Sequence, residues 1–132
     1  MSFLLDAHTF LWALAEPAQL SPKVRDILED AKNDVFVSAV TFWEISLKFG
    51  LGKLELNGAT PNDLPAMAVE AGFSLLPLLP EEAAMYHSLE ANWHKDPFDR
   101  MLMQQAIHNK LTLLSKDRNI ARYQSDILKV IW

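Results

Sequence analysis

Short apolar runs alternate with segments of helical periodicity along the whole chain. Phe3-Leu4-Leu5 and Val35-Phe36-Val37 have the length of buried strands, and each is followed by a stretch whose apolar residues recur every three or four positions. Buried strands that alternate with helices are typical of a parallel sheet covered on both faces. The pattern therefore predicts an α/β fold with a mainly parallel, roughly five-stranded sheet.

The same pattern gives approximate bounds for the elements. The segments predicted as strands are residues 3–5, 35–37, 73–76, 111–114 and 127–132. The segments predicted as helices are residues 7–15, 22–31, 40–50, 61–71, 80–89 and 97–106, with a short helix after Asp117. Several of these helices open on a capping residue followed by proline, as at Ser21-Pro22 and Asp96-Pro97. No repeat or linker interrupts the alternation, so residues 1–132 are expected to form one domain.

Composition narrows the class of protein. No apolar run reaches the ~18–20 residues of a membrane helix, and the start Met1-Ser2-Phe3-Leu4-Leu5-Asp6 has no basic region like that of a signal peptide. The chain has no cysteine, which excludes disulfides and thiolate metal sites and fits a cytoplasmic location. The net charge of −5 argues against a protein that coats nucleic acid by charge alone, but not against a nuclease whose metal ions neutralise its site.

Acidic residues follow the predicted strands or begin the predicted helices. Asp6 and Asp117 come after strands, while Asp96 and Asp99 open the helix at Pro97. Helix capping is a competing explanation for Asp6, Asp96 and Asp117, and an acid at the third helical position, as at Asp99, favours the helix dipole. Glu44 lies inside a helix between Trp43 and Ile45, where its alternative is a weak pair with Lys48 four residues on.

In a parallel sheet these strand-to-helix junctions all lie at one edge, which is where ligands bind in open α/β sheets. Several ionised carboxylates gathered there would repel one another unless a cation lay between them. Oxygen ligands without cysteine suit Mg²⁺ or Mn²⁺. The sequence therefore indicates a divalent metal site.

Four blocks of this sequence together resemble the PIN domain, and more narrowly the VapC-type ribonuclease toxins of type II toxin–antitoxin pairs. The blocks are Leu4-Leu5-Asp6-Ala7-His8-Thr9-Phe10-Leu11-Trp12, Ser38-Ala39-Val40-Thr41-Phe42-Trp43-Glu44-Ile45-Ser46-Leu47-Lys48, His94-Lys95-Asp96-Pro97-Phe98-Asp99-Arg100 and Leu114-Ser115-Lys116-Asp117. The resemblance implies a three-layer α/β/α sandwich and a Mg²⁺- or Mn²⁺-dependent endoribonuclease. It also implies a homodimer and a small VapB-like antitoxin as inhibitor.

The resemblance carries an acidic tetrad onto Asp6, Glu44, Asp99 and Asp117, with Asp96 as an added acid. The residue after the first acid is often Thr in this group, whereas Ala7 stands here, so Thr9 is the candidate for the missing hydroxyl. A further set of side chains is expected to contact the RNA backbone or the ligands: Ser38, Lys48, Lys95, Arg100 and Lys116. Ser38 has capping of the helix that follows as its alternative role.

Two other functions compete with the nuclease. One is a catalytically silent PIN-like interaction module that keeps the acids as helix caps. The other is a phosphoacceptor receiver-like domain, which fits poorly because receivers place paired acids after the first strand, and Asp6 is followed by Ala7. His8 and His94 lie near the proposed site, but their spacing is not that of a zinc-binding motif. Trp93, beside the acidic turn, is a candidate for stacking on a base of the RNA.

Overall fold

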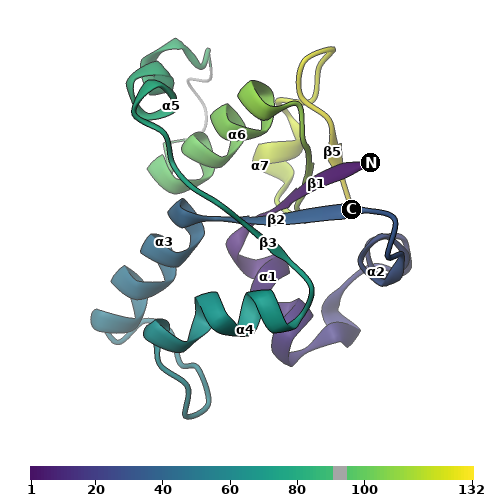
Figure 1. The fold of residues 1–132 in the computed structure, drawn as a ribbon. Coiled ribbons are helices and arrows are strands. Elements are labelled where there is room, and N and C mark those ends of the chain that lie inside the picture. The colour runs from purple at the N-terminus through teal and green to yellow at the C-terminus, as the bar shows by residue number, and fades with distance from the viewer. Residues whose placement is uncertain (91–94) are drawn as a thin grey trace.

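The computed structural model describes residues 1–90 and 95–132, and in these residues a parallel sheet is covered by helices on both faces (Figure 1). The strands are β1 (Ser2–Leu5), β2 (Asp34–Ser38), β3 (Ser74–Leu76), β4 (Thr112–Leu114) and β5 (Val130–Ile131). All four strand pairings are parallel, and the strand order is β3-β2-β1-β4-β5. The predicted five-stranded α/β fold is confirmed.

The helices follow the strands in alternation. The α-helices are α1 (Ala7–Ala15), α2 (Pro22–Glu29), α3 (Ala39–Gly50), α4 (Leu64–Glu70), α5 (Pro80–Ala84), α6 (Pro97–Asn109) and α7 (Arg118–Ala121). Short 3₁₀ turns are η1 (Pro17–Gln19), η2 (Pro61–Asp63) and η3 (Met85–Ser88). The predicted helix over residues 80–89 is thus divided into α5 and η3, and the last strand is shorter than residues 127–132.

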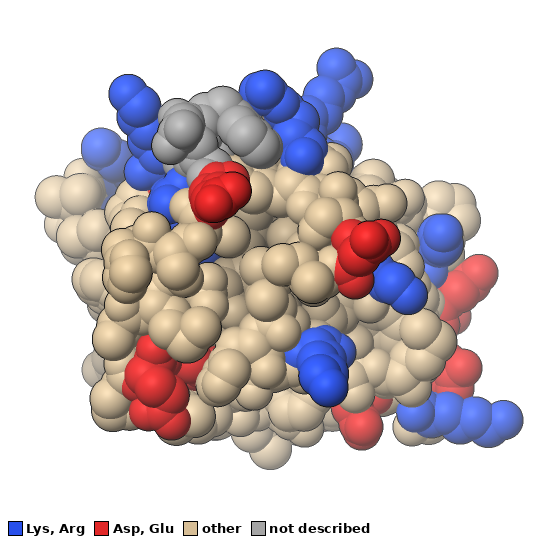
Figure 2. Space-filling view, turned by 90° about the horizontal axis from the view of Figure 1, so that it is seen from above, with Lys and Arg blue, Asp and Glu red and all other residues tan. Residues whose placement is uncertain are grey.

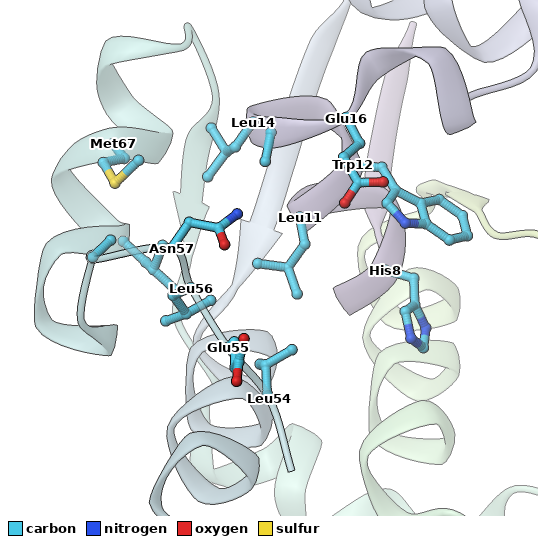
Figure 3. A pocket seen from close by; sticks show the side chains of 13 residues that line it. His8, Leu11, Trp12, Leu14, Glu16, Leu54, Glu55, Leu56, Asn57 and Met67 are labelled. Carbon is cyan, nitrogen blue, oxygen red and sulfur yellow. The ribbon is translucent and has the colours of Figure 1, made fainter. Parts of the chain in front are cut away.

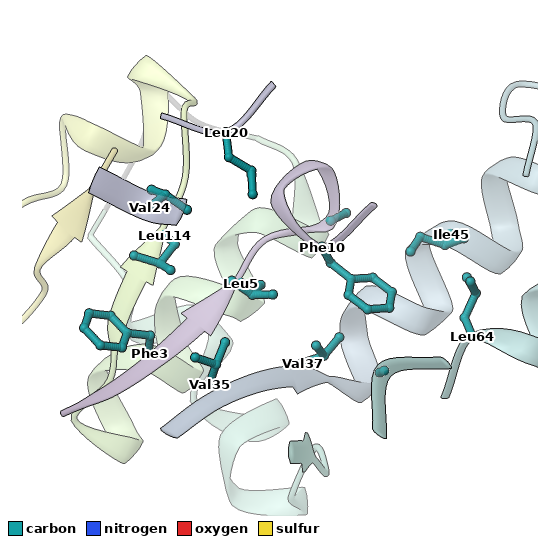
Figure 4. Close-up of a cluster of buried hydrophobic side chains, with 12 residues drawn as sticks. Phe3, Leu5, Phe10, Leu20, Val24, Val35, Val37, Ile45, Leu64 and Leu114 are labelled. Atoms are coloured by element: carbon teal, nitrogen blue, oxygen red, sulfur yellow. The ribbon is translucent and has the colours of Figure 1, made fainter. Parts of the chain in front are cut away.

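Each face of the sheet has its own apolar core, because successive strand residues point to opposite sides. Phe3 and Leu5 of β1 pack with Phe10 of α1 and Val37 of β2 in one core, which Figure 4 shows between the sheet and α1. Leu4 points the other way and packs with residues of α6 and α7, such as Leu102 and Ile120. The predicted three-layer sandwich is therefore present.

The strand order fixes where a ligand site can form. β1 lies in the middle of the sheet, with β2 on one side and β4 on the other. The chain therefore continues from β1 to β2 on one side, and from β4 to β5 on the opposite side. A crevice forms at such a switch point beyond the carboxyl ends of the strands. None of the described helices is long and apolar enough to cross a membrane.

Candidate metal centre

The acidic residues after β1 and β4 are brought together by the pairing of these strands. Leu5 and Leu114, the last residues of the two strands, are paired in parallel register. Asp6 follows Leu5 directly and donates its backbone N–H to the Leu114 carbonyl at 3.3 Å. Asp117 lies three residues beyond Leu114. The two acids therefore leave the sheet at the same edge, as the sequence predicted.

All five predicted acids line one pocket of about 350 Å³ at this edge. The residues that line it are Asp6, Ala7, His8, Trp12, Glu44, Lys48, Asp96, Asp99, Lys116 and Asp117. Asp6 and Glu44 are buried, at 6% and 4% exposed, whereas Asp96, Asp99 and Asp117 are partly exposed. Residues from α1, α3, α6 and the start of α7 thus converge on one hollow.

Three of these acids are also helix caps. The Asp6 carboxylate accepts from the Thr9 N–H at 2.9 Å, and that of Asp117 accepts from the Asn119 N–H at 2.8 Å. The Asp96 carboxylate accepts from the N–H groups of Phe98 at 2.9 Å and Asp99 at 3.2 Å. Each of these bonds uses one carboxylate oxygen, Oδ1, so capping fixes the side chain while the second oxygen stays available. Capping and ligand binding are therefore compatible at these positions.

Glu44 is held differently, because it lies in the middle of α3. Its Oε2 forms an ion pair with the Lys48 ammonium one turn further along the helix. Its Oε1 is buried and has no hydrogen-bond partner among the described residues. A buried carboxylate oxygen without a partner is unfavourable by about 1–3 kcal/mol, so this atom is a candidate ligand for a cation.

Electrostatic crowding is strongest at Asp99. Burial, together with the charges of Asp96, Glu44, Asp6 and Asp117, raises the pKa of Asp99 to about 8. Burial alone would lower the pKa of Lys48, but the hydrogen bond and charge of Glu44, with Asp96 and Asp99, raise it above its ordinary value. The pocket therefore has a strong preference for positive charge.

The donor set fits a hard divalent cation in its chemistry, since it offers carboxylate oxygens, a buried unpartnered oxygen and strong mutual repulsion. Among the described residues, however, no three acidic or histidine side chains are placed closely enough to bind one ion together. The carboxylates surround the hollow but do not form a ready-made cage.

Several residues predicted to bind substrate have other partners. The Thr9 hydroxyl is buried and donates to the Leu114 carbonyl at 3.1 Å, and the Ser38 hydroxyl is buried against Gln105. The Arg100 guanidinium donates to the Leu89 carbonyl at 3.0 Å and lies 5.0 Å from the centre of the Tyr86 ring. These three side chains and Lys95 do not line the pocket, so their predicted contacts with RNA remain predictions without structural support.

Two of the predicted phosphate contacts do line the pocket, namely Lys48 and Lys116. The other basic residues do not form one patch on the face seen in Figure 2, where acidic and basic side chains are interspersed over a mostly uncharged surface. Trp93 and His94, also considered for this site, lie outside the described residues.

Trp12 lines the pocket although the sequence analysis did not single it out for the site. Its ring lies 5.6 Å from that of His8 and 5.8 Å from that of Trp132, and the Lys116 ammonium lies 5.8 Å from its centre. Their spacing in the sequence could have indicated this position, because His8 and Trp12 are four residues apart and share one face of α1, which begins directly after Asp6.

A second, more apolar pocket of about 190 Å³ adjoins the acidic one (Figure 3). It lies between α1, α4 and the segment after α3, with Leu11, Leu56 and Met67 in its walls. His8 and Trp12 line both pockets. A molecule bound in the apolar pocket would therefore reach the rim of the acidic one.

The family model of the PIN domain matches residues 3–125, and the chain belongs to this family. Among curated proteins it is similar to ribonuclease VapC22 of Mycobacterium tuberculosis, with 26% identity over 129 residues that cover 98% of this chain and 97% of the relative. The relatedness therefore extends over essentially the whole length of both proteins.

Two solved structures have the same fold over nearly the whole of this chain. One is VapBC2 of Rickettsia felis bound to a promoter DNA fragment, with a TM-score of 0.71, 16% identity and 99% of each chain covered. Another is FitAcB of Neisseria gonorrhoeae, with a TM-score of 0.58, 25% identity and coverage of 98% of this chain and 96% of that one. These likenesses agree with the α/β/α sandwich described above.

Proposed function

We propose that this chain, as one domain over residues 1–132, is a metal-dependent endoribonuclease and the toxin of a VapBC-type toxin–antitoxin pair. The observation that carries the proposal is the convergence of Asp6, Glu44, Asp96, Asp99 and Asp117 on one pocket at the carboxyl edge of the sheet. Membership of the PIN family and the likeness to ribonuclease VapC22 support the same reaction. An RNA substrate would place the activity in the cytoplasm.

In this proposal Asp6, Glu44, Asp99 and Asp117 hold Mg²⁺ or Mn²⁺, and Asp96 stands beside them. The bound cation would supply an activated water and charge neutralisation at the phosphate. The helix-capping bonds of Asp6 and Asp117 hold these carboxylates at the pocket wall before any ligand arrives. Lys48 and Lys116, on the same wall, neutralise the incoming RNA backbone.

The test is cleavage of an RNA panel by the purified protein with Mg²⁺, with Mn²⁺ and with EDTA. We expect cleavage with either cation, none with EDTA, and loss of cleavage in Asp6→Asn, which keeps an oxygen that can cap α1. The exposed Asp26→Asn is the matched control and should cleave like the wild type. Equal background in the wild type and in Asp6→Asn would reject the nuclease.

The silent interaction module is the second candidate, and a specific observation favours it. Asp6, Asp96 and Asp117 all cap helices, as that alternative requires. Capping does not explain the buried Glu44, whose Oε1 has no partner among the described residues. A module without a metal would gain stability from Glu44→Gln and would show no Mn²⁺ binding in calorimetry, whereas the nuclease would bind Mn²⁺ and lose affinity in this variant.

The partner proposed is a VapB-like antitoxin whose helix fills the apolar pocket beside the acids. The pocket wall formed by Leu11, Leu56 and Met67 suits the apolar face of a helix, and His8 and Trp12 connect it to the acidic pocket. A basic side chain of the same partner could then neutralise the carboxylates. Expression of the chain alone should arrest growth, and co-expression of the cognate small protein should relieve the arrest. The variant Leu56→Asp should weaken this relief while it leaves RNA cleavage intact.

A homodimer is proposed through the outer face of α3. Trp43, Leu47 and Leu51 recur every fourth residue and are 60%, 44% and 60% exposed. A contiguous apolar stripe of this kind is unusual on a monomer surface. Light scattering should give twice the monomer mass for the wild type, and Leu51→Glu should shift the protein to the monomer. A monomeric wild type would reject this oligomeric state without affecting the proposed reaction.

A further inference from the structure

A buried polar network outside the acidic pocket joins the start of α3 to α5 and α6. Its centre is Gln105 of α6, which is fully buried. The Gln105 amide oxygen accepts from the Ser38 hydroxyl, and its nitrogen donates to the Pro77 carbonyl at 3.2 Å and to Glu82 Oε1 at 3.4 Å. None of these residues lines the acidic pocket.

The network is anchored on its far side by Glu82, which is also fully buried. Its carboxylate accepts from the Leu79 N–H at 3.0 Å and the Asn109 amide at 2.6 Å, and its Oε2 lies 2.9 Å from His108 Nδ1. A buried carboxylate with this many donors is stable as an anion. Gln105 is thus held between a fixed acceptor and the start of α3.

Ser38 gives the network its connection to the acidic pocket. It is the N-cap of α3, and its hydroxyl oxygen accepts from the Val40 N–H at 3.0 Å while the same hydroxyl donates to Gln105. The position at which α3 begins is therefore tied to α6. Glu44 lies six residues further along α3, about 9 Å along the helix axis at ~1.5 Å per residue.

The two helices meet at a second point beside the acids. The Trp43 ring packs edge-on against the Phe98 ring, with centroids 4.9 Å apart. Glu44 and Asp99 are the residues directly after these two aromatic residues. Because Ser38 meets Gln105 and Trp43 meets Phe98, α3 and α6 run antiparallel, with one contact at the start of α3 and a second in its middle, beside Glu44.

We propose that Gln105 is a positioning residue for the metal centre, which sets the placement of Asp99 on α6 relative to Glu44 on α3 through its hydrogen bond to Ser38. The ring pair prefers an edge-on arrangement but makes no hydrogen bond, so it resists a small shift or rotation of the helices only weakly. The Gln105 amide resists both movements, because any shift would leave buried polar groups without partners. A displacement of ~1 Å at a reacting centre is enough to lower a rate by about a hundredfold. The inference rests on the proposed function, and it adds a residue that touches neither metal nor RNA.

The test compares Gln105→Met with Gln104→Met. Methionine keeps the volume of glutamine and removes its hydrogen bonds. Gln104 is the neighbouring buried glutamine on α6, but it lines a different pocket with Tyr123 and Leu128. Mn²⁺ affinity is measured by calorimetry, and RNA cleavage is measured at saturating Mn²⁺. We expect Gln105→Met to weaken Mn²⁺ binding by about tenfold and to lower kcat without a change in the KM for RNA. Gln104→Met should keep the wild-type values for Mn²⁺ binding and cleavage.

A second variant removes the same hydrogen bond by changing Ser38 at the start of α3. It tests the positioning role of Gln105 even if Gln105→Met does not fold. Ser38→Ala should weaken Mn²⁺ binding like Gln105→Met, and the double variant should be no weaker than either single one. Ser21→Ala, which removes the equivalent cap of α2, controls for loss of a cap and should leave Mn²⁺ binding unchanged.

Each contrary result has a distinct meaning. If Gln105→Met and Ser38→Ala lower the melting temperature but bind Mn²⁺ like the wild type, Gln105 serves only the stability of the core and the inference is wrong. Additive effects of the two changes would also overturn it. A wild type that binds no Mn²⁺ would reject the proposed function, and the positioning role with it.

Discussion

The molecule contains two carboxylates, the buried Glu82 and the half-buried Asp99, in contrasting surroundings. Glu82 is surrounded by hydrogen-bond donors. Burial would raise the pKa of Glu82, but the hydrogen bonds from His108, the Leu79 N–H, Asn109 and Gln105 lower it below its ordinary value. Asp99 lies at the acidic pocket among other acids, and burial with their charges raises its pKa to about 8. The surroundings of Glu82 therefore favour its charged form, whereas those of Asp99 favour its neutral form.

This contrast separates a structural acid from one in the proposed metal centre. A buried carboxylate that has its donors contributes to folding and needs no ligand. Acids that crowd together repel one another and reduce the stability of the protein without a ligand, which is a usual sign of a site arranged for a ligand. Burial alone does not distinguish Glu82 from Glu44, since both are almost fully inaccessible to water. The neighbouring charges and hydrogen-bond donors distinguish these two carboxylates.

The largest effect expected is on catalysis at Asp99. Asp99→Asn removes one charge from the proposed metal centre, so RNA cleavage with Mn²⁺ should fall by about 10²–10³-fold. The same change relieves repulsion, so the free energy of unfolding in EDTA at pH 7 should rise. Cleavage assays and denaturant titrations of one preparation check both results. A variant that is less stable than the wild type and still cleaves RNA would reverse the contrast.

Glu82→Gln should give the opposite pair of results. The amide places donors against the donors of Asn109 and His108, so the free energy of unfolding should fall by about 2–3 kcal/mol. RNA cleavage by the fraction that remains folded should fall much less than in Asp99→Asn. The exposed neighbour variant Glu81→Gln is the control and should unfold like the wild type. Urea titration followed by tryptophan fluorescence measures the difference.

The sequence predicted the acidic pocket but not the Glu82 network, for a physical reason. Asp6 and Asp117 stand at junctions of predicted strands and helices, and parallel pairing brings such junctions to one edge regardless of side-chain detail. Glu82 follows Pro80 at the start of a helix, where an acid reads as a surface residue that favours the helix dipole. Its burial depends on how α5 packs against α6, which no local pattern encodes.

The same limit explains the substrate contacts. The sequence places Thr9, Ser38 and Arg100 close to the acids along the chain, but it does not reveal which way each side chain points. Thr9 and Ser38 turn inward to Leu114 and Gln105, and Arg100 contacts Leu89 and Tyr86. Position in the sequence was sufficient to predict which acids share one edge of the sheet. The contacts of side chains that have several possible partners depend on the packing of the folded chain and could not be predicted in this way.

The pH dependence of stability should separate Glu82 from Asp99 in sign. The pKa of Glu82 is lower in the folded chain than its ordinary 4.5, so its stabilisation is present above about 4.5 and is lost as the pH falls through the folded value. The pKa of Asp99 is raised from 3.8 to about 8, so its destabilisation grows as the pH rises between these values. Unfolding in EDTA should therefore show Glu82→Gln approaching the wild type at acid pH, and Asp99→Asn exceeding it increasingly toward pH 8.

The smallest effect expected is at the rim of the acidic pocket, on Lys116. This side chain is exposed and lies 5.8 Å from the centre of the Trp12 ring, so its contribution to folding is small. If it contacts one phosphate of a single-stranded RNA, Lys116→Ala should weaken RNA binding only a few-fold and reduce the salt-dependence slope by about 0.7. Binding is measured in Ca²⁺, which we expect to occupy the site without supporting cleavage. Lys32→Ala, an exposed lysine between α2 and β2, should leave the slope unchanged. An unchanged slope in Lys116→Ala would assign this lysine to the Trp12 ring rather than to RNA, and would leave Lys48 as the basic residue of the pocket that faces the backbone.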